Sequence, residues 1–177
     1  TMRNALAVGA DRAIRINAEA KDAYFVASQL AEVVKAEGFD VVLAGIESSD
    51  YNGNAVGSML SELLDYPSVS SVSKFEIDGG QIVFNREIDG GSEVLNISAP
   101  VVAIVQKGIA LEPRIPAMRG IMMARSKPLN VVEPVAVDAL TEHVGFELPP
   151  AKAACKMVAE DNVAELVRLL HEEAKAF

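Results

Sequence analysis

The stretch that decides the fold runs from Asp40 to Leu60 and reads D-V-V-L-A-G-I-E-S-S-D-Y-N-G-N-A-V-G-S-M-L. It begins with a continuous apolar run, residues 41–45, which is typical of a strand buried on both faces of a parallel sheet. A polar loop follows, and apolar residues at helical spacing then predict a helix over residues 56–64, which ends before Tyr66 and Pro67. The stretch is therefore a strand, a loop and a helix in that order.

The residues before this stretch repeat the same alternation. Residues 13–17 predict a short strand, and apolar residues spaced by three and four predict a helix over residues 21–37, closed by Gly38. A short helix is expected before them, at residues 2–10. Strand, helix, strand and helix in this order predict an α/β fold with a mostly parallel sheet.

The middle of the chain predicts an antiparallel insert, residues 69–98. Two D-G-G turns begin at Asp78 and Asp89, where glycine can supply positive φ, and they separate three β-rich runs. These runs are residues 72–77, 81–88 and 93–98. An apolar strand follows at residues 101–105.

From residue 106 to residue 160 six prolines interrupt any long element, and a segment of this length without regular structure is typical of a functional or partner-bound region. A helix is expected after Asp161. We predict an α/β domain over residues 1–132, and a C-terminal arm with a helix over residues 133–177.

Composition limits the possible functions. The 177 residues carry a net charge of −9, which disfavours binding to nucleic acid. One cysteine, Cys155, and two histidines exclude a disulfide framework and predict no metal site. No apolar run reaches the roughly 18 residues of a membrane span. A reducing, cytoplasmic compartment fits best.

The loop before the 56–64 helix is a candidate phosphate-binding site. It lies after a strand and before a helix, where free backbone N–H groups and the helix dipole favour an anion. The alternative is that Asp50, Asn52 and Asn54 merely cap the helix. The candidate nucleotide-binding residues are Asp50, Asn52, Gly53, Asn54, Ala55, Val56 and Gly57.

A second candidate site lies in the basic stretch from Lys107 to Lys127. It carries five basic residues and one acidic residue, a local charge of +4 in an acidic chain, and several methionines. Methionine-rich faces serve as adaptable docking surfaces, and basic residues steer acidic partners. The alternative is a buried helix whose arginines reach solvent.

The chain resembles the β subunit of electron transfer flavoproteins. The resemblance runs from the first residues to the last helix and rests on motifs in family order. They are A-L-A-V-G-A-D-R-A-I at 5–14, D-x-x-x-N-x-x-G-x-M at 50–59, R-E-I-D-G-G at 86–91, P-V-V-A-I-V at 100–105, E-P-R-I at 112–115 and M-R-G-I-M-M-A-R at 118–125.

The resemblance implies a three-layer, Rossmann-like, adenine-nucleotide-binding subunit of a heterodimer. Its α subunit holds FAD, and this subunit binds AMP or a second FAD. The C-terminal arm and helix, residues 133–177, are then expected to pack on the α subunit. The complex carries electrons from flavin dehydrogenases of the acyl-CoA dehydrogenase type, in fatty acid oxidation, to a respiratory acceptor. It acts in the bacterial cytoplasm or the mitochondrial matrix, and it is not an enzyme that transforms a substrate.

The resemblance also implies that residues 112–125 form a recognition loop with Met118 as its apolar anchor. The partner-docking residues are then Arg114, Ile115, Met118, Ile121, Met122 and Arg125. Val56 stands where many AMP-binding members have a hydroxyl residue, which leaves the backbone amides as donors. Family members continue before Thr1, so we expect the family's N-terminal segment to be missing here.

Two other classes remain open. One is a stand-alone adenine-nucleotide-binding protein of the universal-stress-protein type, which would need neither the antiparallel insert nor the basic arm. The other is an interaction protein without a nucleotide.

Overall fold

The structure is a computed structural model that describes residues 1–152 and 154–177, with Asp78 described by its backbone alone. It divides into two compact units, Thr1–Glu142 and His143–Phe177. Each unit is described by itself. The functional domain boundary expected after residue 132 stays a prediction.

Three helices of the first unit form where the apolar spacing predicts them: α1 (Met2–Ala7), α2 (Ala23–Glu37) and α3 (Val56–Leu64). For α2, the residues at its two ends explain where the helix begins and stops. Asp22 accepts a hydrogen bond from the N–H of Phe25 at 2.8 Å, and Gly38 adopts the left-handed conformation, with φ of 68°, that ends the helix.

The larger sheet has the strand order β2-β6-β3-β4-β5. Its parallel part is β2 (Val41–Gly45) beside β6 (Val101–Val105), and β6 beside β3 (Ser68–Asp78). β4 (Gln81–Ile88) and β5 (Gly91–Ile97) continue it antiparallel. Because β2 pairs with β6 alone among the described strands, Leu43 is 53% exposed, and the expected burial of this run on both faces is wrong.

Strand β3 joins the antiparallel insert to the parallel strands. It starts four residues before the predicted run because Ser68 and Val69 pair with Val102 and Ala103 of β6. The register then shifts near Ser71, whose φ is 55°, before β3 turns to β4. The insert is thus an extension of the main sheet.

A separate two-stranded parallel sheet pairs β1 (Ala13–Ile16) with β7 (Leu129–Val132). Neither β7 nor α4 (Met118–Ala124) was expected within the proline-rich region. Both are short, and Pro116 and Pro128 lie just before them, so their sequences carry little periodicity. The α/β class with a mixed sheet is confirmed, but the described strands form two sheets.

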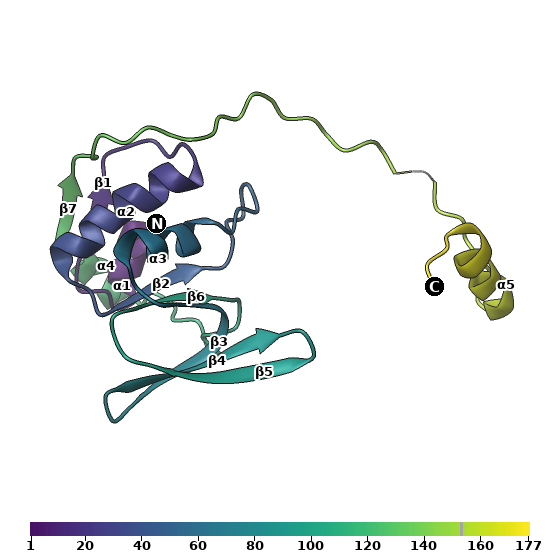
Figure 1. The fold of residues 1–177 in the computed structure, drawn as a ribbon, viewed down its shortest axis with the longest axis horizontal. Helices are drawn as coiled ribbons and strands as arrows, with labels where there is room; N and C mark the ends of the chain where they lie inside the picture. The colour runs from purple at the N-terminus through teal and green to yellow at the C-terminus, as the bar shows by residue number, and fades with distance from the viewer. Residues whose placement is uncertain (153) are drawn as a thin grey trace. The chain divides into compact units, whose positions relative to one another are not determined.

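Alternating residues of β6 serve two cores. Val102 packs with a buried cluster from α2 and α3 that includes Ala27, Ala31 and Leu60. On the opposite face its neighbours Val101 and Ala103 join a second buried cluster, completed by Val69, Val72, Ile82 and Phe84. Figure 1 shows α2 and α3 lying over the same side of the sheet.

The second unit contains the helix expected after Asp161. It comprises α5 (Val163–Arg168), continued by the π-helical turn η1 (Leu169–Glu173). Across the described parts of the chain, no helix combines the length and the apolar character that crossing a membrane requires.

Candidate functional site

The loop between β2 and α3 is shaped by contacts within itself. The N–H of Ser48 donates to the carbonyl of Gly53 at 3.0 Å, and the N–H of Tyr51 donates to the carboxylate of Asp50 at 2.9 Å. The hydroxyl of Ser48 and this N–H lower the pKa of Asp50 below its ordinary value. Asn52 takes a left-handed φ of 50°, which asparagine tolerates in turns. The predicted residues therefore form a turn that leads into α3.

The first turn of α3 has no side-chain cap. Ala55 stands at the N-cap, and the first bond runs from the N–H of Met59 to its carbonyl at 3.0 Å. Among the described residues, no side chain of Asp50, Asn52 or Asn54 accepts a bond from this turn. The capping alternative is therefore not found, and the first-turn N–H groups stay available to an acceptor.

Gly57 seats the start of α3 on the sheet. A Cβ atom at this position would lie 2.8 Å from Cγ1 of Ile104 and 3.4 Å from Cβ of Ala44. Only a residue without a side chain permits this approach without displacing the buried Ile104. The close packing holds the N–H groups of the first turn at the carboxyl end of β2.

The same sheet edge carries residues that the sequence did not place there. The N–H of Ile46 donates to the carbonyl of Val105 at 2.9 Å, so the loop leaves the sheet beside the end of β6. Gln106 and Lys107 follow directly, which places a cation at the edge that carries the loop. The sequence alone does not show that the apolar runs of β2 and β6 pair in parallel, and this pairing puts their carboxyl ends at one edge of the sheet.

The six predicted docking residues lie in or next to α4, and all are exposed. Met118 is 73% exposed and Met122 is 65% exposed, while the buried residue of α4 is Ala124. In this chain the alternative of a buried helix is therefore wrong. Positions 118, 121, 122 and 125 share one helix face by their spacing.

Helix α4 is fixed to α1 through close backbone contact. A Cβ at Gly120 would lie 2.4 Å from the carbonyl oxygen of Ala7. Lys127 donates to the carbonyls of Leu6 at 2.9 Å and Ala10 at 2.6 Å, which satisfies the end of α1 with a cation. These contacts leave the apolar face of α4 directed away from the core, where its side chains are exposed.

The segment after β7 is held on α2. Gln29 is buried, donates to the carbonyl of Val135 at 2.8 Å and accepts from the same residue's N–H at 2.8 Å. Asp22 accepts from the N–H groups of Leu140 at 2.7 Å and Thr141 at 2.9 Å. These two side chains, which we call the α2 clamp, fix the base of the C-terminal arm.

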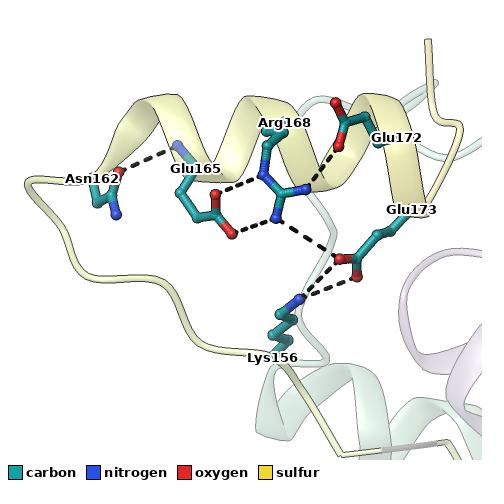
Figure 2. A network of polar contacts seen from close by, with 6 residues as sticks. All are labelled: Lys156, Asn162, Glu165, Arg168, Glu172 and Glu173. Atoms are coloured by element: carbon teal, nitrogen blue, oxygen red, sulfur yellow. Dashed lines mark hydrogen bonds and ion pairs between the residues drawn. The ribbon is translucent and has the colours of Figure 1, made fainter.

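Ion pairs hold the helix of the second unit together, as Figure 2 shows. Arg168 contacts Glu165 at 2.7 Å and Glu172 at 2.7 Å, and Lys156 contacts Glu173 at 3.1 Å. The pairing raises the pKa of Arg168 and lowers that of Glu165. Large apolar side chains are exposed along this unit: Val144, Phe146, Leu148, Met157, Val163, Leu166, Val167 and Phe177.

Comparison with known proteins shows the family to which this chain belongs. A family model described as an electron transfer flavoprotein domain matches residues 1–137. The chain belongs to the electron transfer flavoprotein family. The resemblance seen in the sequence is thereby confirmed, and the family is named for electron transfer and not for the transformation of a substrate.

Three members of the electron transfer flavoprotein family illustrate the similarity, each named electron transfer flavoprotein subunit beta. The protein of Syntrophomonas wolfei is 39% identical over 155 residues, which cover 86% of this chain and 61% of the relative. That of Bacillus subtilis is 34% identical over 98% of this chain and 73% of its own length. The Homo sapiens protein is 35% identical over 94% and 69%. This chain thus spans about three fifths of the first relative.

The family match includes the β2–α3 loop, α4 and the α2 clamp, whereas the second unit lies beyond it. Within the described residues no three His, Cys, Asp or Glu side chains form a group suited to a metal ion. The candidate surfaces of this family member are therefore an amide-lined loop, a basic and apolar helix face, and an apolar arm.

Proposed function

We propose that the chain is the β-type subunit of an electron transfer flavoprotein, an electron carrier and not an enzyme. In this proposal it pairs with an α subunit that holds FAD. The complex takes electrons from flavin dehydrogenases of the acyl-CoA dehydrogenase type and passes them to a respiratory acceptor. The observation that carries the proposal is the family match over residues 1–137.

The proposed nucleotide site is the β2–α3 loop within a three-layer, Rossmann-like domain. Its fit rests on the uncapped first turn of α3 and on Gly57, because N–H groups at a helix start suit a phosphate. Val56 offers no hydroxyl, so the backbone and the amide of Asn54 are the donors. The ligand is AMP or a second FAD, and a flavin there would supply a further redox centre.

The nucleotide proposal is tested by co-expressing the chain with an α subunit and measuring FAD and AMP per heterodimer. We expect a yellow heterodimer that holds one FAD and one AMP, or two FAD. Asn54→Ala removes a hydrogen bond to a charged group, worth about 1.5–3 kcal/mol, and should weaken retention roughly tenfold or more. Asn96→Ala, at an exposed asparagine of β5, is the matched control.

Equal nucleotide content in the Asn54 and Asn96 variants would argue against the loop as the binding site. A colourless monomer that binds adenine nucleotide alone would favour the stand-alone alternative. A colourless monomer without nucleotide would leave an interaction protein. These results are separable because colour, stoichiometry and oligomeric state are measured independently.

The proposed docking site for the dehydrogenase is the exposed face of α4. Met118 is its apolar anchor, since a flexible thioether adapts to a partner pocket. Met118→Ala should raise the KM for the donor flavoprotein by roughly tenfold while the FAD content stays constant. Truncation of an anchor that becomes buried in the complex costs about 1–2 kcal/mol or more of binding free energy. Steady-state electron transfer measures it. Equal loss of flavin would show that α4 contacts the cofactor subunit instead.

The proposed role of residues 143–177 is to pack on the α subunit. Eight large apolar side chains are exposed among the residues of this unit that the structure describes, and surfaces of this kind mark protein interfaces. The compartment in this proposal is the bacterial cytoplasm or the mitochondrial matrix.

A further inference from the structure

A cavity of about 420 Å³ lies where α1 and α4 pack against each other, lined by Arg3, Asn4, Ala7, Ile121, Ala124 and Arg125. The close contact of Gly120 with Ala7 fixes the two helices on either side of it. The volume falls within the range of about 300–1,000 Å³ typical of ligand pockets. The lining residues thus come from α1, from α4 and from Arg125 at its C-terminal end.

The lining holds two guanidinium groups and no carboxylate. Arg3 donates through one terminal nitrogen to the carbonyls of Ala124 at 2.5 Å and Lys127 at 2.9 Å. This anchoring leaves the other N–H groups of its guanidinium without a hydrogen-bond partner among the described residues. The side chain of Arg125 forms no hydrogen bond or ion pair in the described parts of the chain.

Three of the other six arginines are paired with a carboxylate in the described parts of the chain, whereas the two cavity arginines are not. The chain has 25 acidic and 16 basic residues, and Arg12, Arg86 and Arg168 each lie within 4 Å of a carboxylate. The ion pairs among the described residues include neither Arg3 nor Arg125. A guanidinium group donates two parallel N–H bonds to a carboxylate or a phosphate, and an apolar wall beside it favours a carboxylate carried on methylene groups.

The cavity is continuous with the proposed docking face. Ile121 and Arg125 line it, and both share the stripe of α4 that carries Met118. Ala7 and Ala124 add an apolar wall that suits the methylene groups of a glutamate or aspartate side chain. A protein seated on Met118 would therefore bring an acidic side chain to this position.

We propose that the α1–α4 cavity receives a carboxylate side chain of the protein that docks on α4, held between Arg3 and Arg125. The proposal rests on the proposed docking function of α4. It adds α1 to the interface, assigns the partner an acidic residue next to its apolar pocket, and gives Arg3 a role besides closing the end of α4.

The test compares Arg125→Gln with Arg119→Gln in the assembled heterodimer, measuring KM and kcat for the donor flavoprotein over a salt series. Both variants remove one charge from the same helix segment, but only Arg125 lines the cavity. We expect Arg125→Gln to raise KM about tenfold at low salt, with flavin content unchanged, and Arg119→Gln to raise it less than twofold. The difference should shrink as salt rises.

Three outcomes would overturn the proposal. Equal effects of the two variants would mean that the arginines act only through long-range electrostatic attraction of the partner. No effect of Arg125→Gln would remove the carboxylate contact. A third outcome is that inorganic phosphate stabilises the heterodimer more than chloride does at matched ionic strength. If Arg125→Gln abolishes this stabilisation and leaves KM unchanged, the cavity is a site for a free anion.

Met118→Ala separates this proposal from the docking proposal on which it rests. If that variant raises KM while Arg125→Gln and Arg119→Gln behave alike, the docking face stands and the cavity proposal fails. If it leaves KM unchanged, docking on α4 itself is wrong.

Discussion

At the scale of single residues, two glycines decide where the candidate surfaces lie. Gly57 lets the first turn of α3 reach Ile104, and Gly120 lets α4 reach the carbonyl of Ala7. In each case the feature of interest, an amide-lined turn or an exposed helix face, depends on a close backbone approach. The absence of a side chain at these two positions thus shapes both candidate surfaces.

Gly57→Ala should destabilise the protein, because the new Cβ would lie 2.8 Å from a buried isoleucine atom. Overpacking of this kind costs about 1–3 kcal/mol, and each kcal/mol lowers the Tm of a chain this long by about 2–4 °C. Gly53→Ala is the matched control, since its Cβ would meet nothing nearer than 3.7 Å. Thermal unfolding measures both, and equal Tm values would show that α3 shifts freely on the sheet.

At the scale of elements, the α2 clamp links the body of the fold to the arm. One helix supplies both Asp22 and Gln29, seven residues apart and so on the same face. Their partners are backbone groups of the segment that follows β7. The clamp holds a segment without regular structure in place through side-chain hydrogen bonds where no sheet partner exists.

Asp22→Asn should release this segment. Four N–H and O–H donors converge on the Asp22 carboxylate, and an amide offers one acceptor oxygen. We expect the N–H groups of Leu140 and Thr141 to exchange with deuterium several-fold faster, while that of Phe25 stays protected because asparagine is a good N-cap. Unchanged exchange at residues 140–141 would mean that other contacts hold the segment.

The same carboxylate predicts a dependence on pH. The N–H of Phe25, followed by the donors of Thr141 and Leu140, lowers the pKa of Asp22 below its ordinary value of 3.8. Its contribution to stability is therefore fully present above about pH 4 and is lost as the pH falls through the lower folded-state pKa. The difference in urea midpoint between the protein and Asp22→Asn should shrink over that window. A constant difference would exclude this carboxylate as the cause.

At the scale of the whole molecule, the two units differ in what stabilises them. The first unit has two buried clusters, whereas the second has exposed apolar residues and the surface ion pairs of Arg168, which contribute little by themselves. Burial of these apolar side chains on a partner is what the proposed function assigns to this unit. This contrast agrees with the proposed packing of the arm on an α subunit.

Truncation after Glu142 should separate folding from assembly. The shortened chain keeps every clamp contact, so its unfolding midpoint should match that of the full chain, and its circular dichroism should lose only the helical signal of α5 and η1. Its association with the α subunit should weaken by at least a hundredfold, because the exposed apolar side chains of the arm are lost. Size-exclusion chromatography measures this. A truncated chain that still forms a stable heterodimer would show that the arm is dispensable.

The sequence by itself determined the elements whose periodicity is local. The helical spacing of α2 and α3 and the D-G-G turns of the antiparallel strands indicated the fold class, and the six motifs taken together in order indicated the family. The charge and methionines of residues 107–127 also predicted a docking stretch, whose side chains in α4 are exposed. Each of these signals lies within a few consecutive residues, where propensity and spacing act.

Only the tertiary structure decided what depends on contacts between distant residues. The pairing of β1 with β7, the clamp on the arm and the cavity between α1 and α4 all join segments more than 100 residues apart. The exposure of Leu43 likewise depends on which segments cover β2 in the folded chain. Short strands and single hydrogen bonds leave no periodic trace in a sequence. Packing decides which segments pair. That Arg125 has no carboxylate partner among the described residues is visible only once the chain is folded.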